Sequence, residues 1–90
     1  MLNTLEDLFK LARERKRNPV AGSYTNKLLI DKSLSKEKVI EEINELIEAV
    51  EDSSNKIHEA ADVLYHLLMY LESNDIKIEE IMAELSNRKK

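Results

Sequence analysis

The sequence predicts an all-α domain, and three features of its composition and patterning support this fold class. The 90 residues include one glycine and one proline, too few for the many turns of a β-sandwich. Charged residues make up 36% and hydrophobic residues 42% of the chain, a balance typical of a compact helical protein. Hydrophobic residues also recur every three or four positions, as they do on amphipathic helices. We therefore expect four helices that form a bundle or half of one.

A chain of this length is expected to form a single domain over residues 1–90. A domain so small buries only about 60–65% of the surface that its unfolded chain exposes. Its core should therefore be thin, and we expect a partner chain to cover part of the surface.

The first helix is expected to begin at Asn3 or Thr4, because Asn3 followed by Glu6 resembles a capping box. It should end near Arg17, before an Asn-Pro pair that disfavours helix. From about 18 to 35 the sequence predicts a long irregular loop. A loop of that length in a small domain is more often functional than idle.

Three more helices are expected at about 36–50, 56–72 and 78–87. The polar run at 52–55 separates the first two of them and supplies an N-cap. The helix at 36–50 has an apolar stripe that should face the core; it consists of Val39, Ile43, Leu46, Ile47 and Val50. The last helix is expected to turn four apolar residues inward, namely Ile78, Ile81, Met82 and Leu85.

The third predicted helix carries acids on a face that should be half-buried. One broad face is apolar, and the opposite face combines two acids with Tyr65, His66 and Met69. At about 100° per residue, the acids Glu59 and Asp62 lie within one turn of each other and point the same way. Carboxylates in such a place are costly unless they pair with cations or bind a metal.

The preceding helix supplies more acids that could join them. Glu42 and Glu45 flank its apolar stripe, and an antiparallel pairing of the two helices would bring them opposite Glu59 and Asp62. Four oxygen donors would then converge, and a divalent cation would relieve their repulsion. An all-oxygen set favours Mg²⁺, with Mn²⁺ as an alternative, over zinc. Because glutamate is common on exposed helix faces, a solvated surface is the competing interpretation.

Several function classes are disfavoured by composition. The absence of cysteine excludes disulfides, zinc-thiolate sites and cysteine nucleophiles, and we expect a cytoplasmic location. The start of the chain lacks the pattern of a signal peptide, and no apolar stretch is long enough for a membrane partner to be expected. The net charge of −4 argues against nonspecific binding to nucleic acid.

Basic residues gather before position 18, whereas the stretch from Glu37 to Asp52 is acidic. Basic and acidic regions side by side suit a phosphate ligand that arrives with a divalent metal, although a helix surface of mixed charge explains them equally well. The two histidines are also ambiguous. His66 could contact a substrate or be hydrogen-bonded in the core or a subunit interface, and His58 is expected at the surface.

These residues together resemble phosphoribosyl-ATP pyrophosphatase, a family within the MazG-like all-α NTP pyrophosphatase superfamily. The resemblance extends over nearly the whole chain. It rests on Glu-Glu-x-x-Glu at 41–45, Glu-x-x-Asp at 59–62, Ser-Tyr-Thr at 23–25, and the string EAADVLYHLL at 59–68. The acidic motifs are loose signals alone, but their combination with the other two segments is specific.

The resemblance implies hydrolysis of phosphoribosyl-ATP to phosphoribosyl-AMP and pyrophosphate in histidine biosynthesis. It implies Mg²⁺ held by Glu42, Glu45, Glu59 and Asp62, with Glu41 or Glu45 as the general base. It also implies a homodimer, in which four-helix, hairpin-type domains pair to form a larger helical bundle. Contacts to the nucleotide are expected from eight residues: Arg13, Lys16, Ser23, Tyr24, Thr25, Lys27, Lys38 and His66.

Two positions depart from the family pattern KKVGEE. Glu37 stands in place of a lysine, which removes a phosphate contact, and Ile40 stands in place of a glycine, where a close approach is expected. Both leave the acidic motifs intact, so they bear on substrate preference and activity.

Two other functions stay open. A MazG-like house-cleaning enzyme would perform the same chemistry on noncanonical nucleoside triphosphates, although the Ser-Tyr-Thr segment and the LYHLL string favour the histidine pathway. A non-catalytic helical dimerisation module would show no effect of Mg²⁺ on its thermal stability, whereas a protein that binds the ion only when folded would be stabilised.

Overall fold

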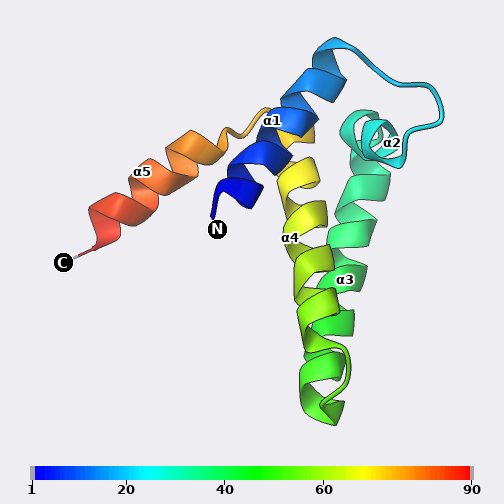
Figure 1. Cartoon of the computed structure of the whole chain (residues 1–90), viewed down its shortest axis with the longest axis vertical. Coiled ribbons are helices and arrows are strands. Elements are labelled where there is room, and N and C mark those ends of the chain that lie inside the picture. The colour runs from blue at the N-terminus through cyan, green and yellow to red at the C-terminus, as the bar shows by residue number, and fades with distance from the viewer. Residues whose placement is uncertain (1, 90) are drawn as a thin grey trace.

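The computed structural model describes residues 2–89, which form five helices. They are α1 (Asn3–Arg17), α2 (Tyr24–Ile30), α3 (Lys32–Asp52), α4 (Lys56–Ser73) and α5 (Ile78–Arg88). Residues 2–89 contain no strand, which confirms the all-α prediction. Figure 1 shows α3 and α4 as a long antiparallel pair, with α1 and α2 packed at its upper end and α5 projecting to one side. None of these helices has both the length and the hydropathy that crossing a bilayer requires.

The predicted loop at 18–35 is wrong in its second half, because that segment contains α2 and the first turn of α3. Ser23 is the N-cap of α2, and its side chain accepts a hydrogen bond from the Asn26 N–H at 3.3 Å. Asp31 ends α2 and also caps α3, accepting from the Leu34 N–H at 3.0 Å. The seven residues of α2 make less than two turns, too few for a helical period to stand out in the sequence. Five helices therefore replace the four expected.

The predicted capping box at the start of α1 is also wrong. The N-cap position is Leu2, and no side chain caps the helix. Asn3 is already the first helical residue, so its amide is not placed to accept from the free N–H groups of the first turn. The end of α1 at Arg17 is as predicted, and both ends of α4 and α5 lie within one residue of the expected bounds.

The hydrophobic core lies where α1 and α2 pack against α4. Its four buried residues are Ala12, Leu28, Leu29 and Met69, and Leu8, Leu34 and Tyr65 pack around them. This core holds α2 against the upper part of α4. The first residues of α2 therefore lie beside the surface along which α3 meets α4.

The apolar stripe of α3 does not face the core as predicted. Ile43, Ile47 and Val50 are 40%, 50% and 56% exposed. The buried residues of this helix are instead Ser35, Glu42 and Ala49. At 100° per residue these two sets lie about 100° apart around the axis of α3, on adjacent faces of the helix. The helix thus turns its small and acidic residues toward its neighbours and leaves an apolar surface uncovered.

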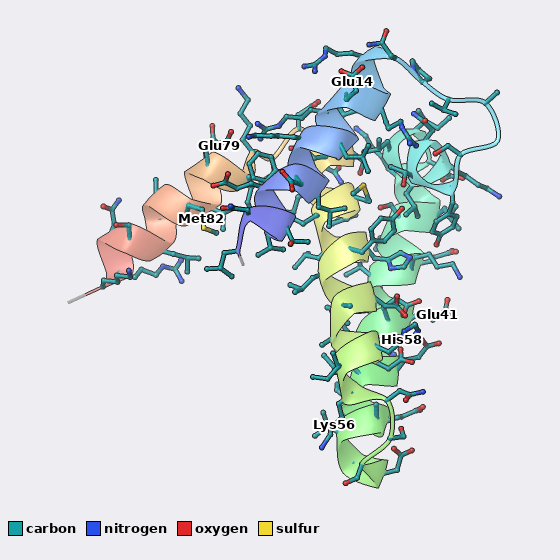
Figure 2. All side chains as sticks on the ribbon, in the orientation of Figure 1. Glu14, Glu41, Lys56, His58, Glu79 and Met82 are labelled. Atoms are coloured by element: carbon teal, nitrogen blue, oxygen red, sulfur yellow. The ribbon has the colours of Figure 1, made fainter. Side chains whose placement is uncertain are left out.

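The last helix, α5, has no buried residue, and Met82 and Leu85 are about half exposed within one chain, against the prediction that they face inward. Ion pairs of Arg13 connect α5 to α1 and α4. The Arg13 guanidinium donates to Glu72 of α4 at 3.1 Å and to Glu79 of α5 at 2.7 Å. Figure 2 shows Glu79 at the end of α5 nearest α1, with Met82 further out.

Candidate functional site

Four carboxylates meet between the facing surfaces of α3 and α4. Besides burial, Glu45 of α3 raises the pKa of Glu42 on its own helix and of Glu59 on α4, so these three carboxylates lie close enough to interact. The charge of Asp62 acts on both Glu42 and Glu59. Donor oxygens of Glu41, Glu42 and Glu45 lie within 4.8 Å of one another. Donor oxygens of Glu59 and Asp62 form a second such group, together with a ring nitrogen of His58. The four predicted metal ligands thus lie in two neighbouring groups, one on each helix, with Glu41 in the first; we call these five carboxylates the acidic cluster.

Two oxygens of the acidic cluster are buried and have no hydrogen-bond partner, namely Oε2 of Glu42 and Oε2 of Glu59. Glu42 is only 8% exposed. Burial raises the pKa of its carboxyl, and the contact with Glu45 raises it further. The pKa of Glu59 is raised in the same way, by burial first and then by the charge of Glu45. Unpaired and mutually repelling carboxylates are the arrangement that a bound divalent cation relieves, so these residues fit such an ion.

Lys38 is the predicted phosphate-binding cation that lies nearest the acidic cluster. Its Nζ is 3.4 Å from Oε2 of Glu41, a contact that raises the pKa of the lysine. Figure 2 shows Glu41 at the right-hand side of the α3–α4 pair, where His58 is also labelled. One lysine offsets only part of the charge of five carboxylates, so the acidic cluster keeps an excess of negative charge.

The start of α2 is fastened to α4 by two hydroxyl contacts. The Tyr24 hydroxyl lies 2.9 Å from Nε2 of His66, and the Thr25 hydroxyl bonds that of Tyr65. The rings of Tyr24 and Tyr65 stack with their centroids 6.5 Å apart and 16° between their planes. Burial raises the pKa of the Tyr24 phenol. These two predicted substrate residues therefore position α2 beside the acidic cluster.

His66 is buried, and both of its ring nitrogens are engaged. Its Nδ1 lies 2.7 Å from the backbone carbonyl oxygen of Asp62. Because a carbonyl only accepts, Nδ1 carries a proton, and in the neutral ring Nε2 then accepts from the Tyr24 hydroxyl. This geometry favours the hydrogen-bonded interior histidine over a substrate ligand. It also links α2 to the backbone of a predicted metal ligand.

A hollow of about 780 Å³ lies beside α2 and is lined by three predicted substrate residues, Ser23, Tyr24 and Lys27, with residues 19–22. This volume falls within the range of small-molecule sites. Ser23 uses its hydroxyl inside the chain, since it accepts from the Arg15 guanidinium at 2.9 Å. Lys27 is exposed, and its ammonium is therefore accessible to a ligand in the hollow.

Two of the predicted substrate residues lie away from the acidic cluster. Besides the contacts of Arg13 described above, Lys16 donates to the carbonyl oxygen of Glu72 at 2.7 Å. Glu72 is nearly three helical turns beyond Asp62 on α4, roughly 15 Å along the axis. The hydrogen bond with Arg13 holds the pKa of the Glu79 carboxyl down to about 2. Arg13 and Lys16 thus neutralise a different group of acids.

Two residues in this region were not predicted to belong to the site, and one of them, His58, is at the surface as expected. Asn26 is buried, accepts from the Val20 N–H at 2.8 Å and donates to the Arg15 carbonyl at 2.7 Å, so it shapes the turn before α2. His58 lies with its Nε2 3.3 Å from Oδ2 of Asp62. The four-residue spacing of this histidine and aspartate is the signal that would have marked it.

Relatives of the chain are found in bacteria and archaea. A phosphoribosyl-ATP pyrophosphatase of Clostridium acetobutylicum is 44% identical over 93% of this chain and 79% of its own length. One from Methanococcoides burtonii is 40% identical over 98% of this chain and 94% of its own. The histidine biosynthesis bifunctional protein HisIE of Pyrococcus furiosus is 41% identical over 99% of this chain, which spans only 43% of that protein. No solved structure gives a significant match.

The family model described as phosphoribosyl-ATP pyrophosphohydrolase matches residues 2–89, which include α3, α4 and every residue of the acidic cluster. The match therefore covers the whole of the described structure. On this evidence the chain belongs to the phosphoribosyl-ATP pyrophosphohydrolase family.

Proposed function

We propose that the chain is a Mg²⁺-dependent enzyme that hydrolyses phosphoribosyl-ATP to phosphoribosyl-AMP and pyrophosphate in histidine biosynthesis. The family match and the names of the relatives support the substrate and the pathway. The structural observation that carries the proposal is the convergence of four carboxylates from α3 and α4, two of which keep a buried oxygen without a partner. Burying unpaired carboxylates lowers the stability of the fold, and a bound cation would explain why they are there.

Glu42, Glu45, Glu59 and Asp62 hold the metal ion in this proposal. An oxygen-only set of this kind suits Mg²⁺, and Mn²⁺ is the alternative. When bound, the ion would neutralise phosphate oxygens and lower the pKa of the attacking water. Glu42 and Glu59 then have to be ionised, which their raised pKa values oppose until the cation is present.

The general base is Glu41 or Glu45. Glu45 lies between Glu42 and Glu59, so it would be a ligand as well as a base. Glu41 is exposed and paired only with Lys38, which leaves it accessible to a water molecule beside the ion. A base must come within hydrogen-bonding reach of the proton it removes, and both residues are at the edge where substrate would enter.

Binding of the nucleotide is assigned to the side of the cluster next to α2. Lys38 and Lys27 supply positive charge for the phosphates, and the hollow beside α2 receives another part of the substrate. Tyr24 holds the start of this helix in place through its bond to His66. Arg13 stays outside the proposed site because Glu72 and Glu79 already engage its guanidinium.

The proposal includes a homodimer built on the uncovered face of the α3–α4 pair. The exposed apolar residues of these helices are Ile40, Ile43, Ile47, Val50, Ile57 and Leu64. The four of these residues on α3 fall within about 80° around the helix, and an exposed apolar surface of this kind is typical of a protein interface. Two α3–α4 pairs would together form a four-helix bundle that covers both stripes. Ile40, one of the two departures from the family pattern, belongs to this face, so its effect is expected on assembly.

Pyrophosphate release from phosphoribosyl-ATP, compared with release from a panel of nucleoside triphosphates, tests the proposed function. We expect Mg²⁺-dependent release from phosphoribosyl-ATP, lost in Asp62→Asn and kept in the control Glu48→Gln, which changes an exposed acid of α3. A preference for ordinary triphosphates would indicate the house-cleaning activity. No hydrolysis, together with no effect of Mg²⁺ on the melting temperature, would indicate the dimerisation module.

A further inference from the structure

His58 lies at the edge of the acidic cluster, in the first turn of α4. A ring nitrogen of His58 and donor oxygens of Glu59 and Asp62 lie within 4.8 Å of one another. A histidine four residues before an aspartate lies on the same face of a helix, the spacing with which one helix offers two ligands to one ion. The imidazole is 69% exposed, so it can adjust its position without disturbing the packing of α4.

Two buried oxygens of the acidic cluster give independent evidence of a ligand. Oε2 of Glu42, a residue more than nine-tenths buried, has no hydrogen-bond partner, and Glu42 lies close enough to Asp62 for their charges to interact. Oε2 of Glu59 is buried and unpartnered as well. Leaving such groups without a partner is unfavourable, and a cation bound between these oxygens and the neighbouring His58 would satisfy them.

The chain contains two histidines, and only one of them has a ring nitrogen directed at the carboxylates. His66 uses Nδ1 on the carbonyl oxygen of Asp62 and Nε2 on the Tyr24 hydroxyl. Nε2 of His58, by contrast, contacts only a carboxylate oxygen of Asp62. His58 is therefore the nitrogen donor available to an ion in the cluster.

We propose that His58 supplies a nitrogen ligand to the cation held by Glu59 and Asp62, and that this ligand raises the affinity of the site for Mn²⁺ more than for Mg²⁺. The inference rests on the proposed function for the presence of a metal, and it changes the ligand set from oxygen alone to oxygen with one nitrogen. Mg²⁺ prefers oxygen ligands and gives up water reluctantly. Imidazole is a ligand of transition-metal ions, which accept a mixed set of nitrogen and oxygen.

The test uses the full chain and Mn²⁺ alone, without substrate. Pulsed electron paramagnetic resonance detects the hyperfine coupling of a nitrogen nucleus bonded directly to Mn²⁺. We expect this coupling in the unsubstituted protein and its loss in His58→Gln, with Mn²⁺ binding weakened about tenfold, as is typical when a supporting group of a metal site is removed. Mg²⁺ binding, measured by calorimetry, should weaken less. His66 remains in both proteins and serves as an internal control.

Lys56→Gln is the matched control on the same helical turn, and it removes a cation without removing a ligand. It should leave the nitrogen coupling intact and should not weaken Mn²⁺ binding. If Mn²⁺ binds the unsubstituted protein without nitrogen coupling, or if coupling persists in His58→Gln, ligation by His58 is overturned while the proposed function stands. If neither Mn²⁺ nor Mg²⁺ binds, the metal site itself is overturned, and the proposed function fails with it.

Discussion

Glu42 is a buried carboxylate at a position where stability alone would favour an apolar residue. It is one of three buried residues on α3, at a position where an apolar side chain would pack against α4 without loss of hydration. Its carboxyl is instead buried beside other acids, with its pKa raised by burial and by Glu45. The stability given up at this residue is consistent with a role in binding a ligand.

Glu42→Gln should therefore stabilise the metal-free protein. The amide keeps the shape of the side chain and removes the buried charge, so we expect the free energy of unfolding to rise by about 1 kcal/mol, or the melting temperature by roughly 4–8 °C. The stabilisation by Mg²⁺ should disappear in the same variant. Thermal unfolding with chelator and with Mg²⁺ measures both effects, and Glu48→Gln is the exposed control. Destabilisation of the metal-free variant would contradict this account.

The raised pKa values of Glu42 and Glu59 also predict how metal-free stability changes with pH. Because both groups bind protons more readily when folded, their stabilising contribution is complete below the ordinary carboxyl pKa of about 4.3 and is lost as pH rises through the raised values. Metal-free protein should therefore become more stable as the pH falls from about 7 toward those values. Glu79 has the opposite dependence, but its pKa of about 2 places the loss at much lower pH.

Melting temperatures between about pH 7 and about pH 5 test this dependence, measured in chelator and in saturating Mg²⁺. With Mg²⁺ the trend should reverse, since protons compete with the ion for the same oxygens. Equal slopes under both conditions would show that the acidic cluster does not govern the pH dependence.

The carboxylates could be predicted from the sequence because their spacing on two helices is a local property. Glu59 and Asp62 share a helix face whatever the tertiary packing is. The contacts of Tyr24 and Arg13 could not be predicted, since they depend on which helix ends meet in space. Tyr24 finds His66, and Arg13 finds Glu72, across more than forty residues of sequence in each case. The expectation that Arg13 contacts the nucleotide was based on its charge, because its partners Glu72 and Glu79 could not be identified from the sequence.

At the scale of the element, the long helices were predictable and the short one was not. The ends of α4 and α5 follow from apolar periodicity and polar turns, which are local signals. The helix α2 is seven residues long and owes its place to packing, since Leu28 and Leu29 are buried in the core between α1 and α4. The rotation of α3 was mispredicted for a related reason. The apolar stripe of α3 was expected to face the core, but the residues of this helix that are buried are Ser35, Glu42 and Ala49.

The attachment of α1 to α4 and α5 should depend strongly on Arg13. In Arg13→Met the buried carboxylate of Glu72 keeps only Lys16 as a partner, and we expect a loss of about 2 kcal/mol in the free energy of unfolding. Arg17→Met on the same helix breaks an exposed pair and should have no measurable effect. Urea titration of both variants measures the difference. Equal stability of the two would show that Glu72 does not require Arg13.

At the scale of the whole molecule, residues 2–89 leave a row of apolar side chains on α3 exposed to solvent. The main cluster of buried apolar residues lies at the upper end of the α3–α4 pair, and Ile43, Ile47 and Val50 of the apolar stripe of α3 are uncovered. Because a small domain buries little of its surface, a second copy over this stripe would contribute much of the total stability. The sequence indicated a partner through the size of the chain, but the face that takes it became visible only in the structure.

Ile47→Lys should convert the proposed dimer to a monomer. The charge would be buried in the proposed interface, whereas the 50% exposed side chain of Ile47 contacts little within one chain. Sedimentation velocity should show a smaller species, and the melting temperature should lose its dependence on protein concentration. Ile30→Lys changes a residue that is 79% exposed on α2 and is the control. A monomeric unsubstituted protein would remove the basis of this prediction.

The placement of the core at one end of the α3–α4 pair has a consequence for local opening. Amides near Leu28 and Met69 are protected by packing in the main core, whereas Glu45 and Glu59 lie nearer the turn between the two helices and outside that core. Backbone hydrogen exchange should therefore be fastest toward the turn between these helices in the unloaded protein. A cation bound by both α3 and α4 would hold this end of the helix pair together. Metal binding would therefore both prepare the site for substrate and stabilise the folded state.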